Sequence, residues 1–219
     1  MPTTEVNEVS ARLDPVLAKR LLPAVVIDQA DLAIPLSEAL LAAGMNVIEV
    51  TFRTAAAEEA IRNIGRRFPA MVLGAGTLLT ADQVSRARDA GATFGVAPGL
   101  SETVVRQAQK VGLQIVPGVV TPSEISRALE LGCQVLKFFP ADASGGVKTL
   151  KALGGAFGHT GVRFVPTGGI DSKNLREYLG LPIVAAVGGS WMVEKSLIAA
   201  RNWKQIELLT REALAAAGA

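Results

Sequence analysis

The sequence has a single cysteine, Cys133, and a single histidine, His159, among its 219 residues. One cysteine cannot form a disulfide within the chain, and this is typical of a protein of the reducing cytoplasm. The shortage of cysteine and histidine also leaves no cluster of thiolate or imidazole ligands for a zinc ion. A zinc site is therefore not expected, and we also expect no other cofactor. Cys133 is interpreted as a small apolar filler and His159 as a surface-loop residue.

Excess charge and long apolar runs are lacking as well. Lysine and arginine number 22 and aspartate and glutamate 20, for a formal net charge of +2. Such a balance gives no basic footprint for nucleic acid or for an anionic membrane surface. Residues 1–20 lack the apolar segment of a signal peptide, and no apolar run is long enough to span a bilayer. We expect neither a nucleic-acid nor a membrane partner.

What the sequence does contain is a recurring unit, in which a helical stretch ends at a glycine and a short apolar strand follows. The glycines are Gly44, Gly91, Gly112 and Gly132, and the last three recur at roughly the length of one βα unit. Glycine suits the left-handed position that follows a helix end. Helix starts are marked by four predicted N-caps, at Thr80, Ser101, Thr121 and Asp171.

Eight strands are expected between these helices. They are short and mostly apolar, as in a parallel sheet that is covered on both faces. Alternating strands and helices with eight strands predict an α/β fold, a single (β/α)8 TIM barrel, with a doubly wound open sheet as the second interpretation. The expected strands are Pro23–Ile27, Val47–Thr51, Met71–Gly74, Phe94–Ala97, Gln114–Pro117, Val135–Phe138, Arg163–Pro166 and Ile183–Val187.

The hydrophobic content of 49% supports one substantial core, so residues 1–219 are expected to form one domain. An extra amphipathic helix at about Glu5–Lys19, within residues 1–20, precedes the first strand. We expect this helix to cover the bottom of the barrel.

Two charged residues interrupt apolar strands near their C-terminal ends, where the active site of such a barrel forms. Lys137 lies in Val135–Phe138 and Glu49 lies in Val47–Thr51. Burial disfavours the ammonium form of a lysine and supplies the free amine that a Schiff base needs. A nearby carboxyl group could move protons. From position alone, a nucleophile with a proton shuttle and a structural ion pair are equally good interpretations.

Glycine-rich segments follow three expected strands. Gly74–Thr77 lets backbone amides approach a ligand, although a tight turn explains it as well. Thr167–Gly169 and Gly188–Ser190 follow the seventh and eighth strands, where barrels often bind phosphate through exposed amides. This pair favours a phosphate site over plain turns. Arg53 lies at the rim, where a guanidinium suits a carboxylate or phosphate, although a surface arginine is the simpler reading.

These segments, taken in their order along the chain, resemble those of the 2-keto-3-deoxy-6-phosphogluconate (KDPG) aldolase family, also called 4-hydroxy-2-oxoglutarate aldolase. The resemblance covers nearly all of the chain after the N-terminal helix. It is carried by the segments Val47–Thr54, Gly74–Thr77, Ala97–Gly99, Lys137–Ala141, Gly145–Lys148, Pro166–Ile170 and Gly188–Trp191.

The resemblance implies a Schiff-base lysine at Lys137 and a general acid/base at Glu49. It implies a metal-free lyase that cleaves a phosphorylated keto acid, and a homotrimer. Its substrate-binding positions match residues in this chain. Arg53 and Thr77 correspond to ligands of the pyruvyl carboxylate, Phe139 to a pocket wall, and Thr167 to a contact with the sugar hydroxyls. The remaining matching positions are Pro98 and the phosphate-site residues Gly168, Gly169, Gly189 and Ser190.

Three other functions remain possible on the sequence. A phosphate-binding isomerase or epimerase needs an acid/base pair but no neutral lysine. An aldolase for the related 6-phosphogalactonate substrate would share Lys137 and Glu49 and differ in its loops. A non-catalytic sugar-phosphate-binding barrel would keep the glycine segments and have no use for a buried lysine beside a glutamate.

Overall fold

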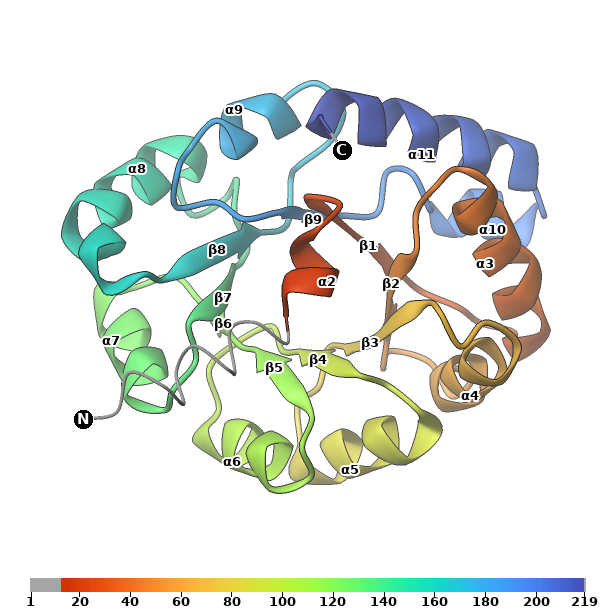
Figure 1. Ribbon diagram of the computed structural model, residues 1–219, viewed down its shortest axis with the longest axis horizontal. Helices are drawn as coiled ribbons and strands as arrows, with labels where there is room; N and C mark the ends of the chain where they lie inside the picture. Colours follow the sequence, from red (N-terminus) through yellow and green to blue (C-terminus); the bar gives the residue numbers. More distant parts are fainter. Residues whose placement is uncertain (1–12, 219) are drawn as a thin grey trace.

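The computed structural model describes residues 13–218 and shows an α/β fold with parallel strands inside and helices outside (Figure 1). The strands are β1 (Leu21–Val25), β2 (Val47–Thr51), β3 (Val72–Gly76), β4 (Phe94–Val96), β5 (Gln114–Val116), β6 (Gly118–Val119), β7 (Val135–Phe138), β8 (Arg163–Pro166) and β9 (Val187–Gly189).

In Figure 1 the helices lie around the ring of strands, apart from the first, which lies over the middle of the ring. They are α2 (Asp14–Leu17), α3 (Ala33–Ala42), α4 (Ala57–Arg67), α5 (Ala81–Ala90), α6 (Glu102–Lys110), α7 (Pro122–Glu130), α8 (Gly146–Phe157), α9 (Leu175–Leu179), α10 (Lys195–Ala199) and α11 (Trp203–Ala217), with the 3-10 turns η1 (Ala30–Leu32) and η2 (Gly158–Thr160). The apolar faces of the helices pack on the strands and form one continuous core.

The strands form two hydrogen-bonded sheets, and this corrects the expected single sheet of eight strands. One sheet has six strands in the order β5-β4-β3-β2-β1-β9, and the other has the order β6-β7-β8. The expected fifth strand is divided at Pro117, which has no N–H to donate, although its carbonyl accepts from Lys137 N at 2.9 Å. Isolated bridges join Phe164 to Val184 and Thr167 to Gly188.

The last strand also lies further along the chain than expected. Ile183–Val187 was predicted, but the sustained pairing with β1 is made by Val187–Gly189. Glycines 188 and 189 therefore belong to a strand and not to a loop. Glycine is needed at both positions because neighbouring side chains approach the strand closely. An added Cβ at Gly188 would overlap the Thr167 hydroxyl, and one at Gly189 would overlap the Trp191 ring.

Helix ends follow local rules well. Thr80, Ser101 and Thr121 are N-caps as predicted, and Thr121 forms a complete capping box with Glu124. The prediction for Asp171 was wrong. Its carboxylate accepts from Lys173 N at 2.7 Å in a turn, and α9 begins only at Leu175, with Asn174 as its N-cap.

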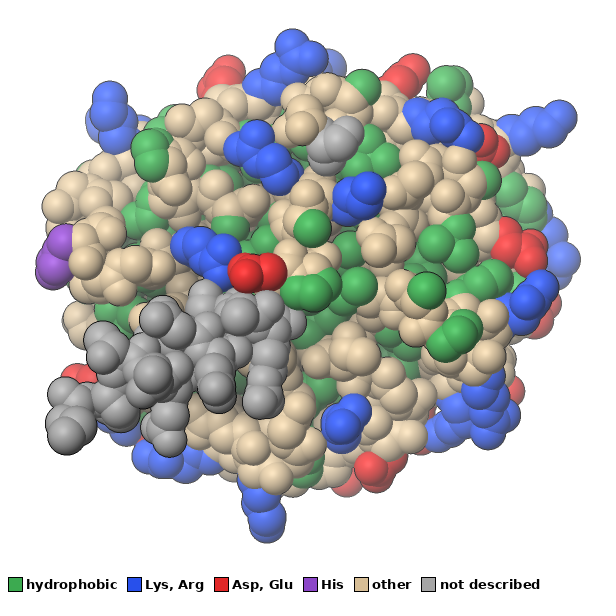
Figure 2. All heavy atoms as spheres, in the orientation of Figure 1, with side chains coloured by type: hydrophobic (Ala, Val, Ile, Leu, Met, Phe, Trp, Pro, Cys, Tyr) green, Lys and Arg blue, Asp and Glu red, His purple; other side chains and the backbone are tan. Residues whose placement is uncertain are grey.

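The described part of the predicted N-terminal helix is α2, which lies near the beginnings of the strands. It contacts β1, and the Asp14 carboxylate pairs with the guanidinium of Arg163, the first residue of β8, at 3.2 Å. Residues 5–12 of the predicted Glu5–Lys19 helix lie outside the described residues. Charged side chains of both signs are scattered over this face and its rim (Figure 2).

Candidate active site

A cavity of about 260 Å³ opens at the C-terminal ends of the strands, at the opposite end of β8 from Arg163. Its lining comes from β1, β2, β7 and β9, from the segments after them, and from the segments after β3 and β8, far apart in the sequence. The residues are Ala24, Val26, Glu49, Thr51, Arg53, Thr77, Lys137, Phe139, Thr167, Gly168, Gly169, Ile170, Gly189 and Ser190. This volume is near the lower end of the range for small-molecule sites.

Lys137 is the buried cation of this cavity. It is the third residue of β7, and only 7% of it is exposed. Parallel pairing with Gly118 on one side and Val165 on the other fixes its backbone. Its Nζ lies 4.9 Å from the centroid of the Phe139 ring, whose face attracts a cation. No carboxylate among residues 13–218 forms an ion pair with it, and its side chain lines the cavity.

Glu49 is the buried acid of the same cavity, with 1% of it exposed. Its Oε1 has no hydrogen-bond partner among the described residues. Burial raises the pKa of the Glu49 carboxyl above its usual range, while the positive charge of Lys137 lowers it by less. A carboxyl group held near its protonated form can donate as well as accept a proton.

Gly76, at the end of β3, makes room for that carboxylate. A Cβ added at Gly76 would overlap Glu49 Oε1 and would lie 2.7 Å from its Cδ. The sequence suggested that this glycine lets backbone amides approach a ligand. In the structure, its missing side chain leaves room for the Glu49 carboxylate.

Arg53 and Thr77 stand at the rim of the cavity, just after β2 and β3. Arg53 is exposed and forms no ion pair within the part of the chain that the structure describes. Thr77 has a φ of 57°, a left-handed conformation that costs energy for a branched residue. Strain of this kind is typical of residues held for a functional purpose. A free guanidinium and a nearby hydroxyl suit a carboxylate ligand.

The glycine segments after β8 and at the end of β9 form the other side of the cavity. Gly168 and Gly169 have φ values of 97° and 75°, which glycine adopts without strain. The neighbouring segment after β7 fixes this loop, because Ala141 N donates to Thr167 O at 2.8 Å and Asp142 N donates to Gly168 O at 3.0 Å. The isolated bridge between Thr167 and Gly188 joins the two glycine segments.

Ten of the eleven residues expected at the site line this one cavity, and Pro98 does not. Its carbonyl instead lies where a side chain at position 118 would be, against β6. Four lining residues were not expected at the site: Ala24, Val26, Thr51 and Ile170. Alternation along β2 places Thr51 on the face of Glu49, a signal that could have identified it. Its hydroxyl donates to Val25 O at 2.8 Å and so ties the ends of β1 and β2.

Comparison with known proteins fits this geometry. The family model for KDPG and KHG aldolase matches residues 14–209. The chain belongs to the KDPG and KHG aldolase family. Among the curated members of this family, the 2-dehydro-3-deoxy-phosphogluconate aldolase of Haemophilus influenzae is 45% identical over 195 residues, which cover 89% of this chain and 91% of that protein. The KHG/KDPG aldolase of Escherichia coli K12 is 42% identical over 88% of this chain and 90% of its own.

A solved structure of the same family is similar over most of its length. The KDPG aldolase of Legionella pneumophila superposes with a TM-score of 0.84 and 43% identity, covering 87% of this chain and 92% of the Legionella chain. That structure holds pyruvate, captured at low pH as a covalent carbinolamine intermediate. Membership of the KDPG and KHG aldolase family makes this chain a carbon–carbon lyase.

Two further properties concern metal ions and membranes. Residues 13–218 contain no group of three or more His, Cys, Asp and Glu side chains that could hold a metal ion. None of the helices in this range is both long and apolar enough to cross a membrane.

Proposed function

We propose that this protein is a Schiff-base aldolase that cleaves KDPG to pyruvate and glyceraldehyde 3-phosphate, and 4-hydroxy-2-oxoglutarate to pyruvate and glyoxylate. The observation that carries the proposal is the presence of two buried ionisable side chains, Lys137 and Glu49, in one cavity. The covalent carbinolamine formed by the Legionella relative with pyruvate supports the same chemistry.

The first steps form the imine. The Lys137 amine attacks the C2 ketone of the substrate, and Glu49 supplies the proton that converts the ketone oxygen to a carbinolamine hydroxyl. The Glu49 carboxylate then takes up the proton that the attacking nitrogen loses and returns it to the hydroxyl, which leaves as water and gives the iminium. The raised pKa of Glu49 suits this work, since the group must hold a proton and then release it.

The iminium then acts as an electron sink for cleavage. The Glu49 carboxylate removes the proton of the C4 hydroxyl, the C3–C4 bond breaks, and its electron pair flows into the iminium to give an enamine. The aldehyde product leaves. Protonation of the enamine at C3 regenerates an iminium, and water hydrolyses it to pyruvate and free Lys137.

The remaining residues hold the two ends of the substrate. Arg53 and Thr77 bind the carboxylate beside the reacting ketone, and Phe139 forms the wall of the pocket next to Lys137. Thr167 contacts the hydroxyls between the ends. The glycines of the two loops, with Ser190, bind the distant phosphate through backbone amides. Fixing both ends turns the attack of Lys137 into a step within one oriented complex.

We extend the proposal to the architecture and the assembly. The bridges of Thr167 to Gly188 and of Phe164 to Val184 support one domain with a closed (β/α)8 barrel. The family resemblance supports a homotrimer, and two exposed leucines, Leu79 at 57% and Leu208 at 49%, are candidates for its contacts. The lone, buried thiol of Cys133 is consistent with the cytoplasm. Sedimentation analysis tests the trimer.

Release of pyruvate tests the proposed activity, with lactate dehydrogenase and NADH as the detection system. Wild-type protein should cleave KDPG, and Lys137→Met should abolish cleavage because methionine has no amine. Lys110→Met, at an exposed helix end, is the matched control and should keep full activity. Faster cleavage of the 6-phosphogalactonate isomer would instead identify that isomer as the preferred substrate. No pyruvate from either isomer would leave a non-catalytic sugar-phosphate-binding protein.

A further inference from the structure

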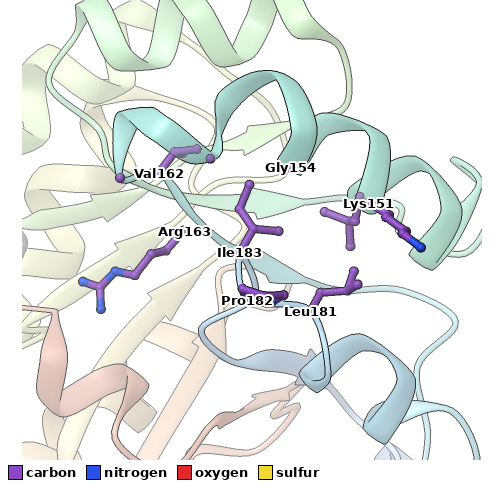
Figure 3. Close-up of a pocket in the computed structure, with 10 residues that line it drawn as sticks. Lys151, Gly154, Val162, Arg163, Leu181, Pro182 and Ile183 are labelled. Carbon is purple, nitrogen blue, oxygen red and sulfur yellow. The ribbon is translucent and has the colours of Figure 1, made fainter.

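A second cavity, of about 360 Å³, lies near the beginning of β8 and therefore away from the proposed active site. It is enclosed between helix α8, the turn η2 and the segment that leads toward β9 (Figure 3). Its volume lies within the range of small-molecule sites. The lining residues are Leu150, Lys151, Gly154, Gly158, Gly161, Val162, Arg163, Leu181, Pro182 and Ile183.

The missing side chain of Gly154 keeps this cavity open. Gly154 and Gly155 lie in the interior of α8, where glycine is less favourable than alanine. A Cβ added at Gly154 would lie 3.6 Å from Cγ2 of Ile183, an ordinary contact, so any longer side chain there would extend into the cavity. A Cβ at Gly155 would meet nothing within 4 Å. A side chain at position 154 would therefore face the cavity lining, whereas one at position 155 would not.

The chemistry of the lining is apolar at the centre and cationic at the edges. Leu150, Val162 and Ile183 are buried, and in Figure 3 the Ile183 side chain projects toward the helix at Gly154. Lys151 and Arg163 extend away from this centre in opposite directions. No lining residue is acidic.

The two cations differ in their partners. Arg163 is paired with Asp14 at 3.2 Å, which offsets its charge. Lys151 is exposed and forms no ion pair with any residue of the range 13–218. The end of the cavity near Lys151 therefore offers a positive charge that the protein itself does not neutralise.

We propose that this cavity binds a small amphipathic organic anion, with its apolar body between α8 and Ile183 and its acidic group beside Lys151. An apolar body would displace water from the apolar centre, which is favourable in proportion to the area covered. The acidic group would remain at the exposed edge, where its attraction to Lys151 requires little desolvation.

Two fluorescent probes of matched shape test the proposal: anilinonaphthalene sulfonate, an amphipathic anion, and phenylnaphthylamine, the same ring system without the sulfonate. Wild-type protein should bind both in titrations that follow probe emission. Gly154→Met, which places a flexible side chain in the cavity, should weaken both by about tenfold or more. Gly155→Met, the same change one residue further along α8, should leave both within about twofold of wild type.

The charge is tested independently of the filling of the cavity. Lys151→Glu should weaken the sulfonate probe by about threefold to fivefold, the size expected for one exposed ion pair, and leave the neutral probe unchanged. Lys148→Glu, on the same helix but outside the lining, is the control. The proposal is overturned if wild-type protein binds neither probe, if Gly154→Met binds both normally, or if Lys151→Glu and Lys148→Glu behave alike. Absence of probe binding together with sedimentation as an oligomer that Gly154→Met disrupts would assign the cavity to subunit contacts.

Discussion

Replacement of Gly76 by alanine should disable the site without removing any reacting group. The backbone at Gly76 is an ordinary strand conformation, so alanine is allowed there. The added Cβ, however, would overlap Glu49 Oε1 and lie 2.7 Å from Cδ and 2.8 Å from Cγ. Either the carboxylate moves or β2 and β3 separate, and both strands are held together by five residue pairs. The side chain is the part that can yield.

The expected size of the effect follows from this overlap. To restore an ordinary contact the carboxylate must move by about 1 Å, and a misplacement of that size costs roughly a hundredfold in rate. Overpacking of a buried site should also lower the free energy of unfolding by about 1–3 kcal/mol. The pyruvate-release assay measures the rate, and urea denaturation measures the stability.

A double-mutant cycle shows whether Gly76 acts through Glu49. If it does, adding Gly76→Ala to Glu49→Ala should cost little further stability, because the overlapping carboxylate has gone. Gly99→Ala, where an added Cβ meets nothing within 4 Å, is the control and should be nearly neutral. A Gly76→Ala enzyme with turnover within about twofold of wild type would refute the reasoning.

Other predictions follow from the same structure. Burial raises the pKa of Glu49 in the folded state above 4.5, so the folded protein is expected to lose stability as the pH rises above that value. Glutamine does not titrate, so the free energy of unfolding of Glu49→Gln, measured by urea denaturation, should fall less between about pH 4 and about pH 9 than that of the wild type. Gly169 has a φ of 75°, and a Cβ added there would crowd Asp142, so Gly169→Ala should distort the proposed phosphate loop. This variant should raise the KM for KDPG by about tenfold and the KM for unphosphorylated 4-hydroxy-2-oxoglutarate far less. An equal rise for both substrates would contradict the phosphate assignment. Thr51→Val removes the hydrogen bond to Val25 O and should cost about 1 kcal/mol by urea denaturation, whereas Thr51→Ser should cost less; equal losses would exclude the hydroxyl as the cause.

Much of the site could be predicted because its chemistry interrupts local patterns. A lysine within Val135–Phe138 and a glutamate within Val47–Thr51 are conspicuous in apolar strands, and the structure has strands at both ranges. The N-caps at Thr80 and Thr121 are equally local, since each side chain bonds to an amide three residues away.

What could not be predicted depends on contacts between distant parts of the chain. Glycines 188 and 189 read as a loop, and only the pairing with β1 and the approach of Thr167 and Trp191 place them in a strand. The fifth expected strand divides at Pro117 because its two halves pair with different neighbours, the first with β4 and the second with β7. Pro98 follows a strand like the other site residues, but its backbone packs against Gly118 outside the cavity lining.

The most direct test of the account is to trap the imine. Incubation with pyruvate and borohydride should add one reduced pyruvyl group, and peptide mass analysis should place it on Lys137. Lys137→Met should give no adduct, and Lys110→Met should give the wild-type adduct. An adduct on another lysine, or none with active protein, would contradict the account.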